Sequence, residues 1–269
     1  MIFDFYGNFG ALNSPPIFEA FEIGLKKHGH EVRHHSGDGD VAVIWSVLWY
    51  GRMASNYPIW QKYRNQNKPV IVLEVGALKR DVTWKIGING INMGSYFVNN
   101  NMDSSRINSF GLTLDDWKTG SNIIICSQHD RSQQWQGNKS LDQWVTDTVN
   151  ELKKHTDKPI KLRPHPRCPV RGISNIKIDT TTPFATDLAT AWAVVNWNSN
   201  PGIESIIHGV PSFVGPTSLA SPVANLQLSQ IANPNKPDRQ QWFNNLAWTE
   251  WTVDEMTKGI PQEYIIASF

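Results

Sequence analysis

Short apolar runs alternate with amphipathic stretches along most of this chain. Runs rich in aliphatic and β-branched residues are typical of strands buried on both faces, whereas apolar residues spaced three and four apart predict helices. The strands predicted in this way cover residues 2–6, 41–47, 69–73, 123–126, 159–162, 173–178, 193–195 and 210–214. The predicted helices cover residues 16–28, 57–67, 141–155, 184–190, 201–208, 238–245 and 252–258. Residues 77–120 follow neither period and are predicted to be irregular.

Strands and helices that alternate in this order predict an α/β fold with parallel sheets and right-handed crossovers. The pattern indicates two Rossmann-like domains in series, with a boundary near residues 112–121. We expect an N-terminal domain over residues 1–118, a second domain over 119–240 and a C-terminal helical segment over 241–269. A cleft between two such domains is a common place for a ligand.

Composition narrows the class of protein. The 269 residues are 40% hydrophobic and 18% charged, with a net charge of +1, which indicates a folded chain without a strong field toward nucleic acid or membrane. No apolar run approaches the roughly 20 residues that span a bilayer, and the first residues lack a signal-peptide pattern. The two cysteines, Cys126 and Cys168, form no CxxC pair and are expected to be reduced thiols. We therefore expect a cytoplasmic protein.

The segment Arg163-Pro164-His165-Pro166-Arg167 follows a predicted strand, where α/β sheets bind their ligands. The two prolines stiffen the loop and hold the side chains between them with little loss of entropy. Arginine binds phosphate bidentately and imidazole can donate to it. The segment therefore predicts a phosphate site, with a rigid turn carrying solvated arginines as the alternative.

A second polar segment, Asn198–Ser205, follows the strand predicted at 193–195 and opens a helix near Pro201. Free N–H groups and the helix dipole favour an anion there. Ser199 and Asn200 would cap this helix and touch a phosphate, and Glu204 would accept hydrogen bonds from ribose hydroxyls. Ordinary helix capping is the alternative.

Two further loops follow predicted strands of the same domain. Gly215–Ser218 would complete a phosphate cradle, or form a plain turn. Ser127–Arg131 is dense in polar residues and would contact a donor or an acceptor.

In the first domain, Glu74-Val75-Gly76 follows a predicted buried strand. A carboxylate at such a position can act as a general base if its surroundings raise its pKa. Gly76 would let the backbone turn sharply or approach another group closely. The alternative is an acid paired with Lys79 or Arg80.

Several other kinds of site are not indicated. The chain lacks a P-loop motif, a dinucleotide fingerprint and a nucleophile elbow. A histidine-rich stretch shows no standard metal-ligand spacing, so a solvated polar loop is expected and no metal site is predicted. Its residues are His28, His30, His34, His35, Asp38 and Asp40.

Three of these motifs, at Glu74, His165 and Ser199, together resemble those of GT-B glycosyltransferases. The resemblance is to the capsule-polysaccharide group in particular, which includes polysialyltransferases and Kdo transferases. Glu74-Val75-Gly76 resembles the acidic-Asp-Gly motif of that group, with Val75 in place of the middle acid. His165-Pro166 resembles its His-Pro motif, and Ser199 resembles its Ser/Thr-rich helix start. The resemblance implies two Rossmann-like domains facing across a cleft, with a C-terminal segment that crosses back onto the first domain.

By this resemblance the chain would move a sugar from a nucleotide sugar, of UDP or CMP type, to an acceptor hydroxyl. Glu74 would be the general base and His165 would support departure of the donor phosphate. No permanently bound cofactor is implied, and a metal is not expected to be required. The donor-binding residues predicted are Arg163, Arg167, Asn198, Ser199, Asn200, Gly202, Glu204, Ser218 and Gln128.

The acceptor is less defined. The size and the Trp- and Asn-rich texture resemble proteins of tailed bacteriophages, some of which glycosylate 5-hydroxymethyl pyrimidines in DNA, and this is the favoured acceptor; the compartment would then be the host cytoplasm. Such an enzyme must flip its base out of the duplex. A glycan or capsule acceptor, a CDP-alcohol phosphotransferase and a non-catalytic nucleotide-binding module are the alternatives. The acceptor-binding residues predicted are Lys79, Arg80, Trp84, Lys85 and His129, with Arg106 as a further DNA contact.

Overall fold

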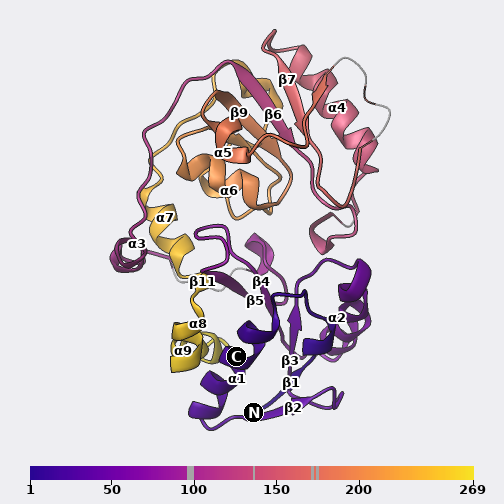
Figure 1. Cartoon of the computed structure of the whole chain (residues 1–269), viewed down its shortest axis with the longest axis vertical. Helices are drawn as coiled ribbons and strands as arrows, with labels where there is room; N and C mark the ends of the chain where they lie inside the picture. Colours follow the sequence, from indigo (N-terminus) through magenta and orange to yellow (C-terminus); the bar gives the residue numbers. More distant parts are fainter. Residues whose placement is uncertain (96–99, 136, 171–172, 174–175) are drawn as a thin grey trace. The chain divides into compact units, whose positions relative to one another are not determined.

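The computed structural model describes residues 1–95, 100–135, 137–170, 173 and 176–269 (Figure 1). The chain divides into two compact α/β units. The first unit comprises residues 1–102, 131–133 and 245–269, and the second comprises 103–130 and 134–244. Residues 103–118, expected in the N-terminal domain, thus belong to the second unit, and most of the C-terminal segment belongs to the first.

The first unit is built on a six-stranded sheet in the order β11-β5-β4-β3-β1-β2. Its strands are β1 (Ile2–Phe5), β2 (Glu31–His34), β3 (Val41–Trp45), β4 (Val70–Val75), β5 (Trp84–Ile88) and β11 (Glu250–Trp251). The strands from β2 to β4 run parallel, whereas β5 runs antiparallel to β4, and β11 antiparallel to β5. The last part of the chain therefore completes the sheet that the first part begins.

Helices cover both faces of this sheet. One apolar core joins the sheet to α1, α8 and α9, with Phe21, Met256 and Ile265 buried in it. A second core on the other face includes Tyr63 of α2 and Ile44 of β3. The helices of the first unit are α1 (Pro15–Lys27), α2 (Asn56–Asn65), α8 (Val253–Lys258) and α9 (Ile260–Ile266), and α7 (Gln240–Ala247) spans a unit boundary.

The second unit has a wholly parallel five-stranded sheet in the order β10-β9-β6-β7-β8. Its strands are β6 (Asn122–Cys126), β7 (Ile160–Arg163), β8 (Lys177–Ile178), β9 (Ala191–Asn196) and β10 (Ser212–Phe213). Its helices are α3 (Ser105–Phe110), α4 (Leu141–Lys153), α5 (Phe184–Leu188) and α6 (Asn200–Ile207). The chain lays β7 and β8 on one side of β6 and then β9 and β10 on the other. The order of strands therefore reverses between β6 and β9.

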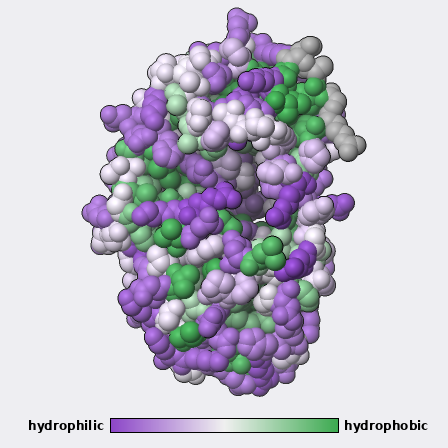
Figure 2. All heavy atoms as spheres, viewed as in Figure 1, coloured by the Kyte–Doolittle hydropathy of each residue, from purple (hydrophilic) through white to green (hydrophobic). Residues whose placement is uncertain are grey.

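These two units confirm the predicted fold class, and the apolar spacing that predicted α1, α4 and α8 is explained by their buried faces. The prediction missed β2, β5, β11, α3 and α9, of which β5 and α3 lie in the segment expected to be irregular. Edge strand β2 has no fully buried residue, and β11 contains only two residues, so neither produces an apolar run. Figure 2 shows hydrophilic side chains over much of the visible surface, interrupted by hydrophobic groups. In the described part of the chain, every helix is too short or too polar to cross a bilayer.

Candidate functional site

The point where strand order reverses in the second unit is where doubly wound sheets bind ligands. Gln128 follows β6 and Asn198 follows β9, and the Asn198 backbone N–H donates to Gln128 Oε1 over 2.9 Å. The Asn198 side-chain amide donates to Thr217 Oγ1 at 2.8 Å. Within the described residues, the buried Gln128 Nε2 has no hydrogen-bond partner. This end of the sheet therefore holds a buried amide donor beside loops that are joined by hydrogen bonds.

Asn196 and Ser199 fix the start of α6. The Asn196 side-chain amide donates to Ser199 Oγ at 2.6 Å, and the Ser199 backbone N–H donates to Asn196 Oδ1 at 3.0 Å. Ser199 is the N-cap in extended geometry, but its side chain makes no capping hydrogen bond to the helix. A Cβ on Gly202 would lie 3.0 Å from Asn196 Oδ1, so glycine lets the helix approach the strand end closely. Asn200 and Glu204 are half-buried in the first turns of the helix.

The His165 loop is attached to the loop after β6. The His165 backbone N–H donates to Ser127 Oγ at 3.1 Å, and the Arg167 backbone N–H donates to His165 Nδ1 at 3.1 Å. Burial, with further contributions from the charges of His129 and Arg167, lowers the pKa of His165 to about 4. The imidazole is therefore neutral at pH 7. Because Nδ1 accepts a hydrogen bond, the proton resides on Nε2, which can donate to a ligand.

Arg163 makes its contacts with the protein itself. Its guanidinium donates to the Asp187 carboxylate and, over 2.7 Å, to the Thr182 carbonyl, and it lies over the Phe184 ring. Asp187 also pairs with Lys161, which lies two residues before Arg163 on the same face of β7. The structure thus places Arg163 in an ionic network that anchors the carboxyl end of β7.

The other predicted donor residues lie in different settings. The Arg167 side chain is exposed beside His165. The Ser218 hydroxyl is buried and accepts a hydrogen bond from the Ala220 N–H at 3.2 Å. The sequence indicated the loops that contain Ser127 and Thr217 without singling out either residue, and it did not indicate that Asn196 would fix the start of α6.

Glu74 lies near the carboxyl end of β4, half-buried. Its Oε1 accepts a hydrogen bond from the Val75 N–H at 2.8 Å, and the Ser46 hydroxyl donates to its carboxylate. Burial raises the pKa of the Glu74 carboxyl, and the hydrogen bonds and the nearby Lys85 charge only partly oppose this. Ser46 has a φ of 61°, which is unusual for a residue other than glycine and often marks a functional site. The arrangement can accept a proton.

A buried carboxylate holds the loop that follows Glu74. Glu250 of β11 accepts hydrogen bonds from the N–H groups of Ala77 and Leu78, at 2.7 and 3.1 Å. A Cβ on Gly76 would collide with this carboxylate and with the Thr83 carbonyl, so the expected close approach at Gly76 is present. The half-buried Lys79 and the exposed Arg80 belong to the same loop.

Three predicted DNA contacts are not presented on the surface. Trp84 is only 5% exposed and packs against Trp45. Lys85 is 4% exposed, in register with Glu74 of β4 and Glu250 of β11. Arg106 is likewise buried, and its guanidinium lies over the Phe110 ring. These positions do not support a wedge or a phosphate grip.

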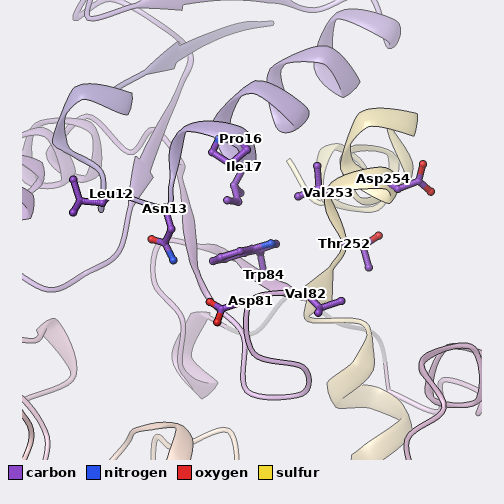
Figure 3. A pocket seen from close by; sticks show the side chains of 10 residues that line it. All are labelled: Leu12, Asn13, Pro16, Ile17, Asp81, Val82, Trp84, Thr252, Val253 and Asp254. Carbon is purple, nitrogen blue, oxygen red and sulfur yellow. The ribbon is translucent and has the colours of Figure 1, made fainter.

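The first unit also has an open apolar pocket of about 690 Å³. Side chains of α1, of the segment before β5 and of α8 surround it, including Ile17, Val82 and Val253 (Figure 3). Trp84 lines this pocket and pairs with Val75, whereas Glu74 is the preceding residue of β4. Because neighbouring residues of a strand point to opposite faces, Glu74 does not face this pocket.

No family model and no curated protein matches the sequence. The β-Kdo 2,4-transferase KpsC of Thermosulfurimonas dismutans is structurally similar at a TM-score of 0.59 and 9% identity, over 96% of this chain and 98% of that one. The β-Kdo 2,7-transferase KpsC of the same organism aligns at a TM-score of 0.47 and 11% identity, over 97% of this chain and 99% of that one. The first of these likenesses shows a shared fold.

Proposed function

We propose that this chain is a glycosyltransferase that takes a sugar from a nucleotide donor and transfers it to a hydroxyl of a glycan. The observation that carries the proposal is the neutral His165 imidazole, whose Nδ1 accepts from the Arg167 N–H and whose Nε2 therefore donates. A donor placed at the carboxyl end of a parallel sheet is suited to a phosphate oxygen.

The donor phosphates would bind where the loops after β6, β7 and β9 meet. The start of α6 supplies the positive end of a helix dipole, and Ser199 and the buried Gln128 amide supply hydrogen-bond donors. The exposed Arg167 would add a cation. These groups would balance the charge of the phosphates, so we expect turnover without a divalent metal. A donor of UDP or CMP type is expected from the resemblance described above.

Glu74 would serve as the general base. In the reaction, the acceptor oxygen forms a bond to the anomeric carbon while the bond between that carbon and the phosphate oxygen breaks. The acceptor proton passes to Glu74, and the bonding electron pair leaves with the phosphate, where the His165 Nε2–H stabilises it. The raised pKa of Glu74 suits a carboxylate that must accept a proton at neutral pH.

A glycan is the acceptor we propose, in keeping with the glycosyltransferase-like fold shared with a Kdo transferase. The 5-hydroxymethyl pyrimidine acceptor favoured by the sequence is not proposed further. Its support depended partly on Trp84, Lys85 and Arg106, which are all buried.

The test measures thermal stabilisation by UDP, CMP, CDP, GDP and dTDP, each with and without magnesium. A bound nucleotide at 100 times its Kd stabilises by about 2.7 kcal/mol. We expect one nucleotide to stabilise the chain without magnesium. H165A should weaken the affinity for that nucleotide by about 10- to 100-fold, which is the contribution of a hydrogen bond to a charged group. The matched control is H208A, which removes an exposed histidine beyond α6.

The outcomes separate the proposal from its alternatives. Nucleotide binding that H165A and H208A affect equally would refute the role of His165. Stabilisation without turnover of any nucleotide sugar would indicate a binding module, and turnover of CDP-glycerol would indicate an alcohol phosphotransferase. In an active enzyme, E74Q should lower kcat by at least about 100-fold; full turnover would show that another group is the base.

A further inference from the structure

We propose that the second unit binds a zinc ion through His129, Asp130 and Cys168, a site separate from the donor-phosphate site proposed above. One ligand atom from each residue lies within 4.8 Å of the other two. His129 and Asp130 follow β6, whereas Cys168 follows β7, so the cluster joins two loops at the carboxyl end of the same sheet.

The three side chains already contact one another. His129 Nδ1 lies 3.2 Å from Asp130 Oδ1, and the Cys168 thiol and the Asp130 carboxylate share a hydrogen bond. In a tetrahedral zinc site, bonds of about 2.0–2.3 Å place the ligand atoms about 3.5 Å apart. Side-chain rotations that shorten the longest separation by about 1 Å would therefore complete the site.

The backbone around the cluster is held in place by other bonds. The Cys168 N–H donates to the His165 carbonyl at 2.9 Å, and these two residues form an antiparallel bridge. The His165 N–H donates to Ser127 Oγ, which ties this turn to the loop that carries His129. Ligands from both loops are thus positioned before a metal binds, which reduces the ordering cost of binding.

The donor set selects the metal. A thiolate, an imidazole and a carboxylate suit zinc, whereas magnesium and calcium prefer oxygen ligands alone. His129 is only 5% exposed, whereas Asp130 is exposed, so one ligand of the site is open to solvent. Cys168 would release its proton to solvent when it binds, and water would complete the fourth position.

Zinc at this position would stabilise the loop that carries His165. The rings of His129 and His165 are 5.4 Å apart in an edge-to-face arrangement. The ion would fix the His129 ring and link the loops after β6 and β7. It would order the loop that carries His165 without contacting the donor phosphate.

The experiment uses the full chain, freed of metal by a chelator and then titrated with zinc and with cobalt. Zinc affinity is measured by competition with a chromophoric chelator, and cobalt reports thiolate ligation through a near-ultraviolet sulfur-to-metal absorption band. We expect one equivalent of zinc per chain and a cobalt band. C168S should abolish the band. It should also weaken zinc binding by more than about 100-fold, because replacing a residue that only supports a ligand already costs roughly 10- to 100-fold.

Two further variants make the result decisive. C126A changes the other cysteine, which lies on β6, and should retain the band and the affinity. D130N alters an exposed position, so it should fold normally and weaken zinc binding. Absence of stoichiometric zinc in the unaltered chain, or a cobalt band that survives in C168S, would overturn the proposal.

Discussion

Replacing Asp187 with asparagine should destabilise the second unit more than any single surface charge change. The Asp187 carboxylate is the shared partner of Lys161 and Arg163, and its side chain is only 5% exposed. Asparagine has nearly the same shape but no charge. The variant would therefore leave two cations beside a single remaining carboxylate, that of Asp179, which lies 2.7 Å from Lys161.

The magnitude follows from how far these groups are removed from water. Breaking a fully buried ion pair costs about 3–5 kcal/mol, because one charge is left uncompensated. An exposed pair contributes about 0–1 kcal/mol. The side chains of Lys161 and Arg163 retain 12% and 19% exposure, so water can partly solvate both cations. We therefore expect D187N to lose about 2–3 kcal/mol, somewhat below the fully buried range.

The assay is urea unfolding with hydrogen exchange of the β6 and β7 amides, which reports on the second unit. With an m-value of about 2 kcal/mol/M, the expected loss lowers the midpoint by roughly 1 M. The control is D147N in the same unit, which breaks the exposed pair with Lys139 and should cost at most about 0.5 kcal/mol. If D187N and D147N differ by less than about 1 kcal/mol, the ionic network does not stabilise β7 as argued.

Three shorter predictions address other parts of the chain. The His165 ring should titrate near pH 4 in the folded chain. Because the ring of the unfolded chain takes up its proton first, the free energy of unfolding should fall as the pH falls from about 6.5 to 4. An NMR midpoint of the ring at or above 6.5 would contradict this. T252A should cost about 1 kcal/mol by removing the capping box of α8, measured by urea unfolding. G76A should cost about 1–3 kcal/mol through its clash with Glu250. By contrast, G94A should be nearly neutral, because among the described residues its Cβ would meet only Asn92, at 3.6 Å.

The spacing of apolar residues predicted the buried strands and the amphipathic helices. The apolar runs located β3, β4 and β6 because those strands are buried along most of their length. The periodic spacing located α4, and Ser140 caps it by accepting from the Gln143 N–H as expected. Strand β5 was missed because its Lys85 interrupts the apolar run, and the structure shows that this lysine is buried between two acidic strand positions.

Arg163 shows why the candidate site could be predicted only in part. The sequence indicates that it ends a strand, and the burial alternation of β7 places Lys161 and Arg163 on one face, opposite Ile160 and Leu162. Two cations on one face require an acidic partner, but nothing in the local sequence says that Asp187, beyond the next strand, supplies it. His165 differs because it lies past the end of the ladder, where its Nδ1 accepts from the N–H of Arg167 in its own loop and only its backbone N–H bonds to a distant residue, Ser127. A residue just beyond a strand end thus keeps its side chain available for a ligand more readily than a strand residue whose partner is a distant acid.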